Sequence, residues 1–182
     1  LDVTITWKIE AAGKIDAVIA VTRDDDVPEL PRFGVRMHLD KNLSAVRNLG
    51  MGPKESYWDK HQAASHGLYR ADVGDLHEDY IRPQENGSHY DCEYVELNNS
   101  RYGIVASAEK AFSFNASYYT QEELEEKTHN YELTESDSVV FCVDYALNGI
   151  GSNSCGPVVL DQYRFDDVLF RFQFTLIPYV KG

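Results

Sequence analysis

The opening stretch LDVTITWKI (residues 1–9) alternates strictly between apolar and polar side chains. A short turn at residues 11–14 separates it from a second alternating run at residues 15–21, and residues 33–39 resume the same period. Successive side chains of a strand point to opposite faces, so this pattern predicts a hairpin with one buried and one polar face. The start of the chain therefore favours an all-β fold built from antiparallel strands.

The same pattern continues along the chain and predicts a large antiparallel β-sandwich. Further strands are expected over residues 44–49, 92–98, 102–108, 112–117, 138–144 and 168–177. One short helix interrupts them. It begins at Thr120, which with Glu123 forms a capping box, and it ends near Lys127 or Thr128. With 182 residues and no linker, the chain is expected to form a single domain.

Composition excludes several classes of function. The formal net charge of −13 argues against a nucleic-acid partner, since phosphate binding needs a basic surface. The longest apolar runs are strand-sized, so no membrane span is predicted. The chain starts inside a strand pattern without a signal peptide, which favours a soluble piece excised from a larger protein. Three cysteines without CxxC spacing and scattered histidines predict neither a disulfide framework nor a metal site.

A long loop is expected between two strands near the end of the chain. Residues 148–157 read NGIGSNSCGP, a composition that no helix or regular strand accommodates. An apolar run precedes it at residues 139–145, and another strand pattern follows it at residues 168–176. Loops of this kind display binding residues on a rigid scaffold. The alternative is an ordinary connection, because any all-β protein needs glycine- and asparagine-rich turns.

Four further motifs share the chain with this loop. They read LPRFG at residues 30–34, GMGPKESYWD at 50–59, YIRPQENG at 80–87 and FNASYY at 114–119. All five, in this order, resemble the C-terminal domain of bacterial β-galactosidases of glycoside hydrolase family 2. The resemblance extends from about Ile9 to Ile177, nearly the whole chain.

The resemblance implies a particular fold and a place in a larger enzyme. Family members share the wide super-sandwich of galactose mutarotases, so residues 1–182 would form the latter part of the C-terminal domain. Strands that precede this part in the family are not represented here, and an exposed sheet edge is expected. The catalytic (β/α)₈ barrel is absent, because the chain lacks its length and its alternating strand–helix pattern.

The resemblance also implies that this fragment has no catalytic residue. Family 2 β-galactosidases are retaining enzymes whose two catalytic glutamates lie on the barrel. Glu55, Glu85 and Asp59 fall within the motifs, but the family does not use these positions as the catalytic pair. The fragment is expected to be inactive alone and to need no cofactor, since the magnesium and sodium ions of the family belong to the barrel domain.

In the resembled enzymes, the loop at residues 148–157 reaches towards the barrel and helps to form the rim of the substrate pocket. The residues assigned to this rim are Asn148, Ser152, Asn153, Ser154 and Cys155. A well-known member carries a tryptophan at the position of Cys155, and cysteine cannot provide an aromatic platform for a sugar. The resemblance therefore implies the placement of the loop, but not stacking on the aglycone.

Four polar residues are candidates for sugar contacts: Arg32, Arg82, Glu85 and Asn86. A guanidinium can hold a carboxylate or a hydroxyl-rich ligand, and the other two can add hydrogen bonds. The favoured alternative is an internal Arg–Glu network that fixes the loops. Tyr57 and Trp58 likewise fit either a carbohydrate-stacking surface or a small core beneath a loop.

The sequence thus predicts an accessory domain of a retaining β-galactosidase, an enzyme that hydrolyses terminal β-D-galactosides such as lactose. Its expected partners are the galactoside, through the parent enzyme, and the remaining domains of the same polypeptide or a large subunit. The expected location is the bacterial cytoplasm or periplasm. The alternatives are a free-standing carbohydrate-binding module, which needs an exposed aromatic platform, and a mutarotase-like sugar-binding protein, which needs a histidine acid and a carboxylate base.

Overall fold

A computed structural model describes residues 1–150 and 158–182, and in these residues strands dominate. The strands are β1 (Asp2–Ile9), β2 (Ile15–Thr22), β3 (Arg32–Asp40), β4 (Ala45–Gly52), β5 (Ser65–Asp72), β6 (His89–Asn98), β7 (Tyr102–Ser117), β8 (Ser138–Leu147) and β9 (Leu169–Val180). The single α-helix of the described residues is α1 (Gln121–Glu126), and three short 3₁₀ turns are η1 (Val73–Leu76), η2 (Asn130–Glu132) and η3 (Asp161–Tyr163).

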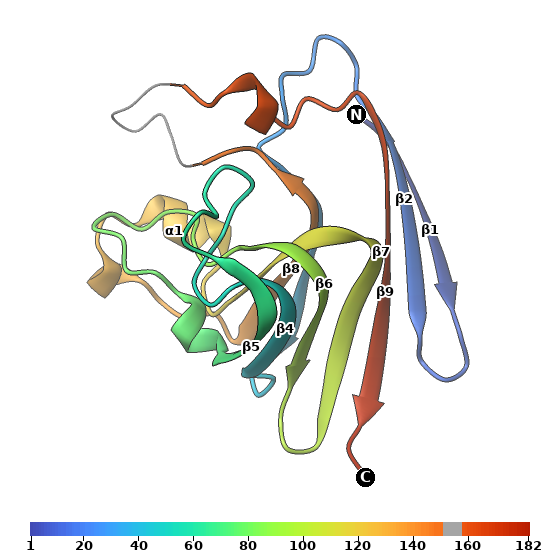
Figure 1. Cartoon of the computed structure of the whole chain (residues 1–182). Coiled ribbons are helices and arrows are strands. Elements are labelled where there is room, and N and C mark those ends of the chain that lie inside the picture. The colour runs from blue at the N-terminus through green and yellow to red at the C-terminus, as the bar shows by residue number, and fades with distance from the viewer. Residues whose placement is uncertain (151–157) are drawn as a thin grey trace.

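All these strands join one antiparallel sheet that branches at β7. The main order is β1-β2-β9-β7-β6-β4-β5, and β8 with β3 forms a second arm (Figure 1). The first half of β7 pairs with β9, from Tyr102 to Ala108. Its second half pairs with β8, from Ser113 to Ser117. One long strand therefore holds different neighbours at its two ends.

The two arms close on one core through aromatic side chains. Phe33 of β3 meets the edge of Phe170 of β9 with ring centroids 5.0 Å apart, and Tyr145 of β8 stacks on the same ring at 4.7 Å. Phe114 and Phe141, from β7 and β8, are completely buried. Facing arms with a shared apolar interior are consistent with a β-sandwich, and the predicted all-β, antiparallel fold is confirmed.

Helix α1 begins as predicted, although only half of the capping box forms. Thr120 Oγ1 accepts a hydrogen bond from the Glu123 amide at 3.1 Å. The Glu123 carboxylate does not return to Thr120 but accepts from the amide of Thr134 at 2.8 Å. The acid thus ties the helix to the following segment. Lys127 caps the other end, as expected.

Two of the predicted strand positions were wrong. Residues 102–108 and 112–117 belong to one strand, β7, because the intervening residues stay extended across the change of partners. Strand β5 was not predicted. Its sequence SHGLYRAD lacks clear alternation, and it lies at the sheet edge beside β4, where few of its side chains need to be buried.

The opposite edge of the sheet exposes an apolar face. Every residue of β1 is exposed, and the apolar side chains from Leu1 to Ile9 retain 44–70% of their surface. The prediction that the apolar face of this strand is buried was therefore wrong for the described residues. Trp7 only touches the edge of Phe174, with centroids 6.4 Å apart. Long apolar edges are usually covered by another strand or domain. No helix in the described residues has the length and apolar character needed to cross a membrane.

Candidate functional site

The described base of the loop at residues 148–157 is held by backbone and side-chain hydrogen bonds. The Asn148 amide donates to the Pro31 carbonyl at 2.9 Å, and Asn148 Oδ1 accepts from the Phe165 amide at 3.0 Å. The Gly149 amide donates to the Tyr163 carbonyl at 2.9 Å. These contacts join the end of β8 to the segments before β3 and β9. Ser152, Asn153, Ser154 and Cys155 lie outside the described residues.

Asp59 holds Ile150, the residue of the loop that follows Gly149. Its Oδ1 accepts a hydrogen bond from the Ile150 amide at 3.1 Å. A Cβ atom on Gly149 would lie 2.8 Å from Asp59 Oδ2 and 2.8 Å from Val159 Cγ1, so a larger residue here would displace the Asp59 or Val159 side chain. Two motifs that are far apart in sequence therefore meet at one place, at the end of the sheet where β8 finishes (Figure 1).

Tyr57 and Trp58, which are neighbours in one motif, lie in different environments. Tyr57 is 2% exposed and belongs to the interior, where burial raises the pKa of its hydroxyl. Trp58 is 44% exposed, and its Nε1 donates to the Gln162 carbonyl at 2.9 Å. Its ring meets Tyr90 and Tyr163 edge-on, with centroids 5.8 and 6.4 Å apart. An exposed indole thus stands beside the loop base.

Arg32 anchors a buried ionic network. As the first residue of β3, it donates from Nε and Nη2 to the two carboxylate oxygens of Asp144 at 3.0 and 2.6 Å. Its Nη1 donates to Glu85 Oε2 at 3.2 Å. The Asp144 side chain is only 2% exposed. A Cβ atom on Gly34 would lie 2.2 Å from Asp144 Oδ1, so this glycine makes room for the carboxylate. The expected Arg–Glu network therefore exists and includes Asp144.

The network shifts the pKa values of its members. Burial disfavours the charge on Arg32, but the adjacent Asp144 carboxylate outweighs burial and raises the pKa of the guanidinium. Burial also raises the pKa of Glu85, against the lowering effect of Arg32. Glu85 Oε1 is buried and has no hydrogen-bond partner among the described residues. This oxygen is the one unsatisfied carboxylate atom in the network.

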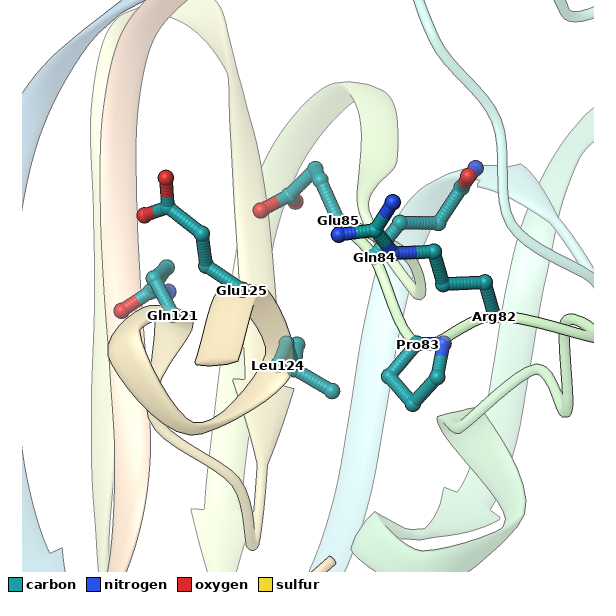
Figure 2. A pocket seen from close by; sticks show the side chains of 7 residues that line it. All are labelled: Arg82, Pro83, Gln84, Glu85, Gln121, Leu124 and Glu125. Atoms are coloured by element: carbon teal, nitrogen blue, oxygen red, sulfur yellow. The ribbon is translucent and has the colours of Figure 1, made fainter. Parts of the chain in front are cut away.

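Arg82 and Glu85 lie on the wall of a cavity of about 460 Å³. Figure 2 shows the loop that carries them on one side and α1, with Gln121, Leu124 and Glu125, on the other. The exposed guanidinium of Arg82 forms no ion pair or hydrogen bond within the described residues. The cavity therefore has an exposed guanidinium and a largely buried carboxylate in its wall, and it can accept a small polar molecule.

Asn86 directly follows Glu85, a residue of the cavity wall, but its own side chain is buried in the interior. It is 6% exposed, its Oδ1 accepts from the Glu78 amide at 3.0 Å, and its Nδ2 donates to the Gln84 carbonyl at 2.8 Å. Its carbonyl accepts from the Asn115 side chain at 2.6 Å. The amide of Asn86 is thus used to shape the turn before β6.

Glu55 joins two of the sequence motifs. Its Oε1 accepts hydrogen bonds from Lys60 Nζ and from the Tyr80 hydroxyl, and its Oε2 accepts from the Gly87 amide at 2.8 Å. The side chain is only 5% exposed. Burial alone would raise the pKa of Glu55, but these three donors outweigh it and lower the pKa below its ordinary value of 4.5. Glu55 is therefore a charged structural carboxylate.

The described residues contain no group of three or more histidine, cysteine, aspartate and glutamate side chains that could hold a metal ion. Cys92 and Cys142 are buried free thiols. Burial raises the pKa of each to about 12. Both thiols stay protonated at neutral pH, so neither is a reactive nucleophile.

For three residues of this region, the partner in the fold was not predicted from sequence. Asp144 pairs with Arg32, Asp59 holds Ile150, and Tyr163 receives the Gly149 amide. A signal for the first was present, because a lone aspartate at the end of the run VVFCVD must find a partner if it is buried. The other two depend on contacts between distant segments, and no local pattern reveals them.

The fold and the loop-bearing end of its sheet define a β-sandwich domain that presents connecting loops on a rigid scaffold. The family described as beta galactosidase small chain matches residues 1–176. The chain belongs to this family.

Curated relatives give the same result. A β-galactosidase of Actinobacillus pleuropneumoniae is 49% identical over 97% of this chain, and one of Staphylococcus xylosus is 37% identical over 95%. A β-galactosidase of Kluyveromyces lactis is 32% identical over 89%. The chain spans 17%, 17% and 16% of the length of these three relatives. In them the matched region is therefore one part of a much longer β-galactosidase.

Proposed function

We propose that the chain is an accessory domain of a retaining β-galactosidase and contributes a loop, but no catalytic residue, to the rim of the substrate pocket. The observation that carries this proposal is the match of nearly the whole chain to one small part of long β-galactosidases. The substrates are terminal β-D-galactosides such as lactose, bound by the parent enzyme. We assign no cofactor to this chain and leave the metal ions of the resembled enzymes with the barrel domain.

The carboxylates of the motifs support a structural role. A retaining glycosidase needs two carboxyl groups about 5 Å apart across the scissile bond, both free to meet the substrate. Glu55 is occupied by three donors, and Glu85 and Asp144 share Arg32. These groups hold loops and strands together, which leaves the catalytic pair to the rest of the enzyme.

The geometry at the end of β8 supports a role for the loop at residues 148–157. Its described base is tied to three separate segments, by Pro31, Asp59 and Tyr163. A loop that is held firmly at its base can present its remaining residues in a defined place. We therefore keep Asn148, Ser152, Asn153, Ser154 and Cys155 as the proposed rim. Arg82 and Glu85, which line the cavity beside α1, are better candidates for sugar contacts than Arg32, which is bonded to Asp144, and Asn86, which is buried.

We also propose that the exposed apolar face of β1 is covered by the remaining domains of the same polypeptide or by a large subunit. Apolar side chains at 44–70% exposure along a whole edge strand are costly in water and favour association. We place the parent enzyme in the bacterial cytoplasm or periplasm.

Residues 1–182 alone are expected not to hydrolyse a chromogenic β-galactoside, because both catalytic carboxylates lie elsewhere. Hydrolysis should appear when the chain is produced together with the rest of its β-galactosidase and should fall when the chain is left out. The measurement is release of nitrophenol under identical conditions. Turnover by the chain alone that disappears in Glu85→Gln would contradict the proposal, since the chain would then carry its own catalytic carboxylate.

Asp59→Ala is expected to raise the Michaelis constant of the assembled enzyme about two- to twelvefold, because losing one hydrogen bond of about 0.5–1.5 kcal/mol loosens the loop base. Asp59→Asn keeps an acceptor for the Ile150 amide and serves as the matched control. Michaelis constant and melting temperature are measured on both variants. A lower melting temperature for Asp59→Ala with an unchanged Michaelis constant would remove this loop from the rim.

A further inference from the structure

One tryptophan of the chain is half-exposed and held in place by its neighbours. Trp58 presents 44% of its surface although its Nε1 is bound to the Gln162 carbonyl. Tyr90 and Tyr163 meet the ring edge-on, so the indole is held from two sides. An aromatic ring that is fixed before a ligand arrives loses little entropy on binding, which makes it an efficient contact surface.

The indole also forms the wall of a cavity of about 270 Å³. Tyr145 and Tyr163 add aromatic surface to this cavity, and Arg164 and Asp167 add opposite charges. Asp167 Oδ2 accepts from the Tyr145 hydroxyl at 3.0 Å. Arg164 uses its Nε towards Glu29 and Asp161, at 3.7 and 3.4 Å. Among the described residues, its two terminal nitrogens have no hydrogen-bond partner.

Size and chemistry narrow the class of ligand. The cavity lies just below the range of about 300–1,000 Å³ typical of drug-sized ligands, which suits one small ring. The aromatic wall needs a flat apolar face, whereas the carboxylate needs donors and the guanidinium needs acceptors. A pyranose ring meets all three demands, because one face carries C–H groups and its hydroxyls both donate and accept.

We propose that Trp58, Arg164 and Asp167 form a subsite for one hexopyranoside, whose apolar ring face stacks on the indole while its hydroxyls bind the two charged groups. The subsite lies beside the loop base, since the neighbouring residue Asp59 holds Ile150. The choice of a galactoside as the ligand rests on the proposed function. Binding of a hexopyranoside to this chain does not rest on it, because Trp58, Arg164 and Asp167 all belong to the described part of the chain.

Trp7 supplies a matched control. It is the second tryptophan of the chain, it is 48% exposed, and it also meets a phenylalanine edge-on. It lies on β1 at the far edge of the sheet (Figure 1), among the apolar side chains of that strand. If exposure of an indole alone caused sugar binding, the two tryptophans would respond alike.

The experiment titrates the 182-residue chain with methyl β-D-galactopyranoside and follows the two indole N–H resonances by NMR. The expected result is a saturable shift of the Trp58 resonance with a dissociation constant of about 1 mM or weaker. Trp58→Ala should weaken binding about two- to twelvefold, as read from ligand-observed saturation transfer, whereas Trp7→Phe should leave it unchanged. Asp167→Asn keeps the indole and should also weaken binding, so the test survives if Trp58→Ala fails to fold.

Several outcomes would overturn the subsite. The Trp58 resonance would not shift, or Trp7→Phe would weaken binding as much as Trp58→Ala, or sorbitol would bind as well as the glycoside. Sorbitol also carries several hydroxyls, but it is an open chain and has no ring face. Failure here is separable from failure of the proposed function, because the latter is measured by hydrolysis in the assembled enzyme and the former by binding to this chain.

Discussion

Replacing Asp144 by alanine is expected to destabilise the chain by about 3–5 kcal/mol, because the change leaves the partly buried guanidinium of Arg32 without its main partner. Asp144 receives two hydrogen bonds from Arg32 on a side chain that is only 2% exposed. Glu85 would remain as a partner, but it bonds only one nitrogen, at 3.2 Å. The measurement is urea unfolding at neutral pH, monitored by tryptophan fluorescence.

The matched control for this prediction is the surface pair of Lys41 and Glu135. Its side chains are 40% and 49% exposed at an N–O distance of 2.9 Å, so Glu135→Ala should cost no more than about 1 kcal/mol. The double variant Asp144→Ala with Arg32→Met should recover part of the loss, because it removes the unpaired charge as well. Equal losses for Asp144→Ala and Glu135→Ala would show that the network contributes no more than a surface ion pair.

The fold class was predictable because the apolar and polar residues alternate over most strands. The hairpin of β1 and β2 follows directly from the pattern of residues 1–21, and α1 follows from the capping residue Thr120. The joining of two predicted strands into β7 was not predictable. It depends on β9 and β8 pairing with successive halves of that strand, which is a property of the whole sheet. The local sequence contains no signal for this change of pairing partners along β7.

The candidate site was predictable only in part, and for a similar reason. The resemblance of the motifs to a known family pointed to Arg32, Glu85 and the loop at residues 148–157. The partner of Arg32 lies 112 positions further along the chain, and the acceptor for the Ile150 amide lies 91 positions before it. Such pairs form only when the sheet brings its strand ends together. The exposure of Trp58 and the burial of Tyr57, which are neighbours in one motif, likewise follow from which side of the turn faces the core.

A second large effect is expected on the pH dependence of stability. Glu55→Gln is expected to lower the free energy of unfolding by about 2–3 kcal/mol at pH 7. Hydrogen bonds to a charged group contribute about 1.5–3 kcal/mol, and the Glu55 carboxylate accepts hydrogen bonds from three donors. The pKa of Glu55 in the folded chain lies below its ordinary value of 4.5. The contribution of the charged Glu55 side chain to the free energy of unfolding is therefore fully present above about pH 4.5. It is lost as the pH falls through the pKa of Glu55 in the folded chain.

The stability difference between the wild-type chain and Glu55→Gln should accordingly be constant from pH 7 to about pH 5 and shrink below pH 4.5. Urea unfolding of both proteins at a series of pH values measures it directly, since all other titrating groups cancel in the difference. Glu78→Gln is the control, because Glu78 pairs with a lysine that is 73% exposed and should show only a small difference at any pH. If the loss caused by Glu55→Gln were the same at pH 3.5 as at pH 7, its charge would not be what joins the two motifs. The packing of the side chain would then hold Lys60, Tyr80 and the turn at Gly87 in place.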